Sequence, residues 1–376
     1  MQRPAFTIGI EEEYLLVDPL TRDLVRDPGD DVWSAFREVL GSQVSPEFLR
    51  AQIEVGTTIC RTVAEARRDL AGLRRRLVGV AEEHGMRLIA ASTHPFADWA
   101  DQQVTDRERY LLLVKDLRVV VRRLVICGMH VHVGIEDPEV RIDLMNQVSY
   151  FLPHLLALST SSPFWHGMES GLKSYRLSVF RSLPRTGIPE QFSSWAEYRR
   201  HVDALVAPGL IEDASKLWWD VRPSERYPTL ELRISDVCTR IDDGMAVAAL
   251  FQSILAMLFR RRSHNQRWRH YAPMLIAENV WRAQRYGTEG SLMDFGRGEL
   301  VPFSDLLEEI IDLVREDAEE LGCVAEVEYA RNVVASGTSA DRQVATYQAA
   351  IAAGGDEQAA LAAVVDELIA DTATGL

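Results

Sequence analysis

The stretch Thr7-Ile-Gly-Ile-Glu-Glu-Glu-Tyr-Leu-Leu-Val17 alternates apolar and polar side chains near the start of this 376-residue chain. Successive side chains of a β-strand point to opposite faces, so the alternation predicts a half-buried strand. One face carries Ile8, Ile10, Tyr14 and Leu16, and the other carries Gly9, Glu11, Glu13 and Leu15. Glu12 falls on the apolar face, and we interpret this exception as a strand edge or a bulge.

Three further stretches, 52–56, 126–134 and 229–235, divide in the same way, and 87–91 is another strand candidate. Their polar faces carry Gln52, Glu54 and Gly56; Gly128, His130, His132 and Gly134; and Glu231, Arg233 and Ser235. Strands of a doubly wound parallel sheet are covered on both faces and have continuous apolar runs instead. The alternation therefore predicts an α+β fold, with an antiparallel sheet that has helices on one face and a polar site on the other.

Helices are predicted between these strands from capping boxes and from apolar periodicity. In a capping box, a Thr or Ser side chain and a Glu three residues later satisfy free backbone amides. Such boxes open predicted helices at Thr62, Thr105 and Ser194, which end at about 84, at about 123 and before Pro208. Further helical runs cover about 139–160, 242–264 and 303–321. We expect a single domain over 1–376, with its catalytic part at about 5–320 and an Ala-rich helical tail at about 339–376 as peripheral packing.

The composition excludes several classes of function. The 56 acidic residues outnumber the 41 Lys and Arg, so the chain has no general attraction for nucleic acid or anionic membranes. No apolar stretch approaches the ~20 residues that cross a bilayer, and no signal peptide precedes the first strand. The four cysteines are far apart in sequence, which predicts reduced, buried thiols in a cytoplasmic protein. We therefore expect small-molecule substrates.

If these strands belong to one sheet, their polar side chains converge on one surface. Its members are Glu11, Glu13, Glu54, His130, His132, Glu231 and Arg233. Four carboxylates without cations would repel each other, and some would have to stay protonated. Oxygen-rich sites with one or two imidazoles suit Mg²⁺ or Mn²⁺, whereas zinc prefers His and Cys. Such cations commonly bridge the phosphates of a nucleoside triphosphate.

A phosphate-binding loop of the Walker A type is missing from the sequence. The nearest approach, Gly167 to Ser174, has its lysine in the wrong place. Metal ions and arginines would therefore have to hold the phosphates. Each motif also has a simpler interpretation, because a single H-x-H or E-x-E strand is usually structural or solvated, and Glu54, Glu231 and Arg233 could form cross-strand salt bridges. Four strands that divide alike favour a functional surface over coincidence.

Together, these motifs are similar to those of a known family. The stretches Gly9-Ile10-Glu11-Glu12-Glu13-Tyr14, Gly128-Met129-His130-Val131-His132 and Glu231-Leu232-Arg233 resemble the YbdK-like carboxylate–amine ligases, which are related to glutamate–cysteine ligase type 2. The resemblance runs from about residue 5 to about 320 and includes 184–189 and 278–287. It implies a glutamine synthetase-like catalytic fold, ATP as co-substrate and three metal positions, and it is compatible with a homodimer.

The resemblance also implies roles for individual residues. The Mg²⁺ or Mn²⁺ ligands would be Glu11, Glu13, Glu54, His130 and Glu231, with Glu47 as a further acidic ligand. Arg233, His132 and Glu231 would form the catalytic group, with Arg233 on the transferring phosphoryl group and His132 beside it or near the nucleotide. Arg282 and Arg285 would clamp the nucleotide phosphates, unless they simply lie on a helix surface. Arg176, Arg181 and Arg185 would bind the carboxylate of the amino-acid substrate, unless they form a solvated basic loop.

The reaction that the resemblance implies is phosphoryl transfer from ATP to the side-chain carboxylate of glutamate. An amine, by default that of cysteine, would then attack the acyl phosphate, form a γ-amide and release phosphate. Three alternatives stay open at this point: the same chemistry with another amine acceptor, a metallohydrolase that forms product without ATP, and a catalytically silent relative that binds Mg·ATP without turnover.

Overall fold

The largest sheet of the protein has seven strands, and every strand pair in it is antiparallel. The strand order is β10 (Val221–Pro223), β11 (Thr229–Leu232), β5 (Met129–Gly134), β1 (Ile8–Val17), β3 (Gln52–Gly56) and β2 (Val44–Pro46), and β4 (Arg87–Ile89) pairs with the second half of β1. This computed structural model describes residues 2–376, apart from the side chain of Arg109. The predicted α+β fold with an antiparallel sheet is confirmed.

All five strands predicted from alternation are present, and β3 has the predicted ends. The strands β2 and β10 were not predicted because three residues are too short to show alternation. Three two-stranded ribbons lie outside the main sheet: β6 (Phe164–Trp165) with β7 (Met168–Glu169), β8 (Thr186–Gly187) with β9 (Trp218–Trp219), and β12 (Ser291–Asp294) with β13 (Glu299–Pro302).

Two long helices, α2 (Val63–Glu83) and α9 (Ile241–Ser263), pack against the sheet and against each other. They cover its apolar face, where Ile8, Ile10 and Tyr14 are buried. By length and composition α9 could cross a membrane, which corrects the expectation that no apolar stretch approaches that length. In the folded protein, 94% of the apolar window of α9 is buried, so its composition is that of a core helix.

Two of the three predicted helix starts are confirmed. The side chains of Thr62 and Ser194 cap α2 and α8 (Trp195–Val206) by accepting a backbone hydrogen bond three residues later. The prediction at Thr105 is wrong, because its hydroxyl donates to the carbonyl oxygen of Glu47 at 2.6 Å, and α3 (Glu108–Leu117) begins later. Arg118, with a φ of 48°, separates α3 from α4 (Val119–Arg122).

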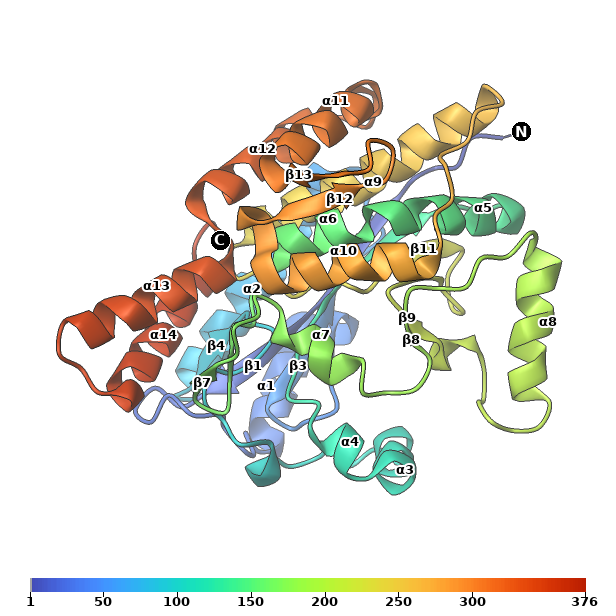
Figure 1. The fold of residues 1–376 in the computed structure, drawn as a ribbon. Coiled ribbons are helices and arrows are strands. Elements are labelled where there is room, and N and C mark those ends of the chain that lie inside the picture. The colour runs from blue at the N-terminus through green and yellow to red at the C-terminus, as the bar shows by residue number, and fades with distance from the viewer. Residues whose placement is uncertain (1) are drawn as a thin grey trace.

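The remaining helices surround this framework, and α8 and the pair α13–α14 lie at opposite edges of the molecule (Figure 1). The predicted run 139–160 is divided into two helices by a short 3₁₀ turn. The helices of the described residues that have not yet been given are α1 (Asp30–Leu40), α5 (Pro138–Val148), α6 (Leu152–Ser159), α7 (Tyr175–Phe180), α10 (Pro273–Tyr286), α11 (Phe303–Leu321), α12 (Val324–Ser336), α13 (Ser339–Ala352) and α14 (Glu357–Thr372). Of these, α1, α7, α10 and α12 were not predicted.

Glu12 lies in the middle of the sheet, so its interpretation as a strand edge or bulge is wrong. It is opposite Val55 of β3 on one side and Met129 of β5 on the other. Its fully buried carboxylate receives two hydrogen bonds of 2.8 Å from Arg74 of α2, and the hydroxyl of Tyr14 donates to it as well. A buried charge needs such a partner, and here the partner comes from the helix that covers this face.

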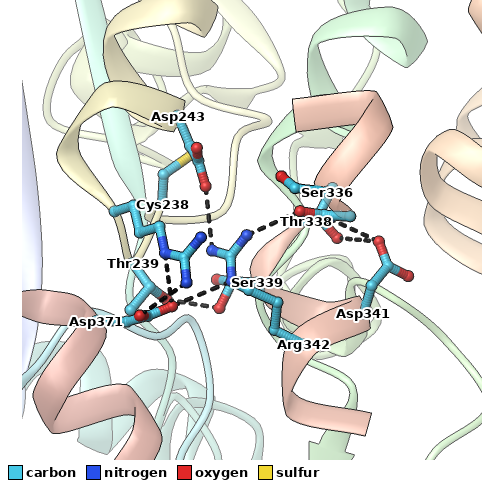
Figure 2. Close-up of polar contacts among 12 residues, drawn as sticks. Cys238, Thr239, Asp243, Ser336, Thr338, Ser339, Asp341, Arg342 and Asp371 are labelled. Carbon is cyan, nitrogen blue, oxygen red and sulfur yellow. Dashed lines mark hydrogen bonds and ion pairs between the residues drawn. The ribbon is translucent and has the colours of Figure 1, made fainter. Parts of the chain in front are cut away.

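The Ala-rich tail is attached to the core through polar contacts as well as apolar packing. Arg342 of α13 lies between Asp243, near the start of α9, and Asp371 of α14, and donates to each at 3.1 Å (Figure 2). The hydroxyls of Thr239 and Ser339 are 2.6 Å apart in the same buried region. Gly354 and Gly355 lie between the two tail helices. All four cysteines are free and buried, as predicted.

Candidate active site

The register of the sheet brings the polar side chains of neighbouring strands together. The opposed pairs are Glu13 and Glu54, Glu11 and His130, and His132 and Glu231. Side chains on directly opposite positions of antiparallel strands lie within contact distance. The four strands that were identified by their alternation therefore place their acidic and basic groups on one shared surface.

Three side chains of this surface lie close enough together that they could hold a metal ion. One donor atom from each of Glu11, His132 and Glu231 lies within 4.8 Å of the others. Nδ1 of His132 is 2.9 Å from the hydroxyl of Thr229, and Nε2 lies 3.6 Å from a carboxylate oxygen of Glu11. That Nε2 atom is buried and has no hydrogen-bond partner. A buried free imidazole nitrogen beside two carboxylates fits a divalent cation, because metal-binding histidines are usually fixed through their other nitrogen.

His130 contacts the same carboxylate from the next position on β5. Its Nδ1 atom lies 3.3 Å from Glu11, so two imidazoles face one carboxylate group. Burial raises the pKa of Glu11, but the neighbouring His130 and His132 outweigh burial and hold that pKa well below its usual range. The pKa of His130 is lowered to about 4 by burial and by Arg233, which keeps its imidazole neutral. Burial lowers the pKa of His132, but Glu11 and Glu231 outweigh burial and raise that pKa above its usual value. The neutral imidazole of His130 and the ionised carboxylate of Glu11 are protonation states that bind metal.

Glu231 is held by two arginines. Arg222 of β10 donates to both of its oxygens at 2.9 and 3.2 Å, and Arg233 pairs with one of them. Burial raises the pKa of Glu231, but Arg233 and Arg222 outweigh it and keep the carboxyl group ionised. Arg222 was missed because its strand is too short to show alternation, although its register position is opposite Glu231.

Three other carboxylates gather around the far half of β1. Glu13 accepts a hydrogen bond from the backbone N–H of Gly128 at 2.8 Å, and Glu47 accepts one from Tyr110 at 2.8 Å. Burial and the charge of Glu47 raise the pKa of Glu13 to about 8 and lift that of Glu54 well above its usual range. These groups resist ionising together without a cation nearby, so they also suit a metal position.

A cavity of about 140 Å³ opens beside Glu13. Its polar side is lined by Glu13, Glu47, Gln52, His130, Arg176 and Arg233. Its apolar side is lined by Leu113 and Leu117 of α3, Val121 of α4, and Phe48, Phe180 and Trp218, among others. The Nε atoms of Arg176 and Arg233 are buried and have no hydrogen-bond partner. The cavity can therefore hold a small molecule with an anionic group near the arginines.

The other predicted arginines lie outside the lining of this cavity. Arg181 forms a 3.0 Å ion pair with Asp220, and Arg185 lines a separate hollow, where it lies over Trp218. On α10, Arg282 donates to a backbone carbonyl at 2.6 Å, and Arg285 lies over the ring of Tyr286. Of the three arginines predicted to bind substrate, the structure places Arg176 at the cavity.

Comparison with known proteins agrees with the motifs. The family model of glutamate–cysteine ligase family 2 matches residues 7–367. The chain belongs to this family. A Rhodospirillum rubrum protein that is named provisionally as glutamate–cysteine ligase 2 is 61% identical over 100% of this chain and 98% of its own length. Membership of the glutamate–cysteine ligase family makes the chain an ATP-dependent carboxylate–amine ligase enzyme, as the sequence motifs implied.

Solved structures show the same fold at low sequence identity. A bifunctional glutathione synthetase from Pasteurella multocida has a TM-score of 0.68 and 15% identity; the match covers 97% of this chain and 52% of that one. A glutamate–cysteine ligase from Francisella tularensis, crystallised with AMP, has a TM-score of 0.66 and 13% identity, with 98% and 89% of the two chains covered. This chain therefore has the fold of these two solved ligases, as the motifs predicted.

Proposed function

We propose that this protein phosphorylates the γ-carboxylate of glutamate with ATP, which releases ADP, and that an amine, by default that of cysteine, then attacks the acyl phosphate to form an amide and release phosphate. The observation that carries the proposal is the group Glu11, His132 and Glu231, which lies on the same surface as Arg233 and a cavity with free guanidinium nitrogens. The arginines on this surface suit the triphosphate of ATP, which a metallohydrolase that works without ATP would not bind. Family membership supports the ligase class in addition.

The carboxylates would hold Mg²⁺ or Mn²⁺ in two groups. In the first group, Glu11 and Glu231 act with the imidazoles, and the orphaned Nε2 atom favours His132 as a ligand beside the expected His130. The second group consists of Glu13, Glu54 and Glu47, whose like charges oppose one another. The bound cations would neutralise the phosphate oxygens during phosphoryl transfer.

The arginines of this surface would stabilise the negative charge that the cations do not neutralise. Arg233 is held by Glu231 at one nitrogen and lines the cavity, so it would donate to the transferring phosphoryl group from a fixed position. Preorganised donors in a buried site stabilise developing charge more than mobile donors in water do. Arg176 would bind the substrate carboxylate at the cavity. A covalent protein nucleophile is not needed, because the phosphoryl group itself activates the carboxylate.

A second candidate is the same chemistry with an apolar amine in place of cysteine. The cavity wall of leucines and aromatic rings favours it, because a polar substrate would leave this surface without apolar contact. Release of ADP across a panel of amines, at constant glutamate and ATP, distinguishes the two candidates.

The site assignment is tested by replacing single ligands. Glu11→Gln and Glu231→Gln keep the side-chain size but remove one negative charge from the metal set, so we expect ATP turnover to be abolished. Circular dichroism should show the fold intact. Wild-type turnover in either variant would contradict the assignment.

We further propose that residues 1–376 act as one ligase domain in the cytoplasm, and a homodimer is compatible with the family. Arg282 and Arg285 would reach the nucleotide phosphates only if their present contacts on α10 changed.

A further inference from the structure

Asp236 is a fully buried carboxylate three residues beyond Arg233. Its oxygens accept three hydrogen bonds, from the backbone N–H of Ser161 at 2.9 Å and from the hydroxyls of Ser162 at 2.7 Å and Ser174 at 2.8 Å. These donors come from two segments, the chain after α6 and the residue before α7. A buried carboxylate is costly unless it is well hydrogen-bonded, so these contacts fix both segments to the chain that follows β11.

Arg176, in the first turn of α7, is the side chain that these contacts place. Its backbone N–H donates at 3.1 Å to the hydroxyl of Ser162, which itself donates to Asp236. Its guanidinium donates to the carbonyl oxygens of Ile234 and Arg233 at 3.2 and 3.3 Å. Through Ser162, Asp236 therefore connects the backbone of Arg176 to the chain segment after β11. The side chain of Arg176 donates hydrogen bonds to the same segment.

The side chain of Arg176 forms part of the cavity wall. Its Nε atom is buried without a hydrogen-bond partner, and the side chain lines the cavity beside Glu13 and Arg233. Burial lowers the pKa of Arg176, and the carboxylates of Asp236 and Glu13 oppose that shift. Asp236 is outside the cavity lining, so it can support the cation without competing for the ligand.

We propose that Asp236 is a positioning residue of the ligase reaction, which fixes the start of α7 so that Arg176 presents its guanidinium to the carboxylate of the amino-acid substrate. The identity of that substrate rests on the proposed function, whereas the placement of Arg176 does not. Asp236 acts through Ser162, Ser174 and Arg176 and does not touch the substrate.

The test compares Asp236→Asn with Asp243→Asn. Asparagine has the size of aspartate but cannot accept all three hydrogen bonds, because its amide nitrogen is a donor. Asp243 is a matched control, since it is another buried carboxylate that instead holds Arg342 of the tail. We expect Asp236→Asn to raise KM for glutamate on the order of tenfold, with KM for ATP unchanged. Asp243→Asn should leave both KM values unchanged.

A double-variant cycle with Arg176→Lys separates positioning from general damage to the fold. If Asp236 acts through Arg176, then Asp236→Asn adds little to the KM for glutamate once Arg176 is Lys. If Asp236 has a purely structural role, the two substitutions should change the KM for glutamate independently, so that their effects multiply, and the amount of active enzyme should fall uniformly. Either result would overturn the proposal. If Asp236→Asn does not fold, Ser174→Ala removes a single hydrogen bond and should raise the same KM about threefold.

Hydrogen–deuterium exchange gives a readout that does not depend on activity. We expect faster exchange at 174–181 in Asp236→Asn with exchange at 339–372 unchanged, and the reverse in Asp243→Asn. Should the wild-type enzyme release no ADP with any amine, the proposed function fails, and exchange still decides the positioning role. Unchanged exchange at 174–181 in both Asp236→Asn and Ser174→Ala would overturn it.

Discussion

Replacing Gly128 with alanine should separate Arg176 from its position at the cavity. Gly128 precedes β5, and a Cβ atom built on it would lie 2.4 Å from a terminal nitrogen of Arg176, where ordinary contact begins at 3.4 Å. The guanidinium would have to retreat by about 1 Å, and a misplacement of that size at a reacting centre can reduce rates ~100-fold. The same strain would reach Glu13, which accepts the Gly128 N–H.

The measurement is steady-state release of ADP, with glutamate varied at saturating ATP. We expect Gly128→Ala to lower kcat/KM for glutamate about 100-fold, while the free energy of unfolding falls by about 1–3 kcal/mol, as for other overpacked sites. Gly72→Ala is the matched control, because no atom would lie within 4 Å of its Cβ and it lies inside α2, where alanine is the better helix former. Wild-type kcat/KM in Gly128→Ala would refute the contact between Arg176 and the cavity as the basis of substrate binding.

Three further predictions concern the metal groups, the core and the tail. Because the pKa of Glu13 is raised to about 8, the folded protein holds a proton on this carboxyl group at lower pH. Binding of Mg²⁺ should displace that proton, and calorimetry in buffers of different ionisation enthalpy should detect its release. The affinity of the protein for Mg²⁺ should therefore rise from about pH 6 to about pH 8. Arg74→Met leaves the buried charge of Glu12 without its arginine partner and should lower the free energy of unfolding by about 3–5 kcal/mol in urea titrations. Adding Glu12→Gln to the same chain should recover part of this stability. A decrease of less than about 1 kcal/mol in Arg74→Met would contradict the pairing. Arg342→Met removes the contacts to Asp243 and Asp371, so proteases should cut within 339–372 sooner than in the wild-type protein, while the rate of ADP release stays within about twofold of the wild-type rate. Protease resistance equal to that of the wild-type protein would show that apolar packing alone holds the tail.

Alternation along four strands was sufficient to predict the inner strands β11, β5, β1 and β3 of the main sheet and the surface that carries the candidate site, but not the short strands β2 and β10. The rule works because a half-buried antiparallel strand must separate its apolar and polar side chains, and the register then places Glu13 opposite Glu54 and His132 opposite Glu231. This prediction can be made without knowing which strands are neighbours. It requires only that the apolar faces of all four strands cover the same core.

Residues whose role depends on distant partners could not be predicted in this way. Glu12 contradicts the alternation because its partner, Arg74, lies on a helix 62 positions later. Thr105 has the sequence of a helix cap, but its hydroxyl is used by Glu47, which is remote in sequence. Asp236 gave no local signal, because its three donors come from segments more than 60 positions earlier.

The four arginines outside the cavity illustrate a related limit. Guanidinium groups suit substrate anions and structural acids equally well, so composition and motif could not distinguish Arg176 from Arg181. The structure separates them, since Arg176 lines the cavity, whereas Arg181 lies outside the cavity lining and is paired with Asp220.

The most direct test of the central claim is the mass of the product formed from glutamate, with and without cysteine, in the presence of ATP and Mg²⁺. The proposed function predicts ADP and a new amide of glutamate and cysteine, formed only when ATP and both amino acids are present. An amide formed without ATP, or no amide with cysteine or any other amine tested, would contradict it.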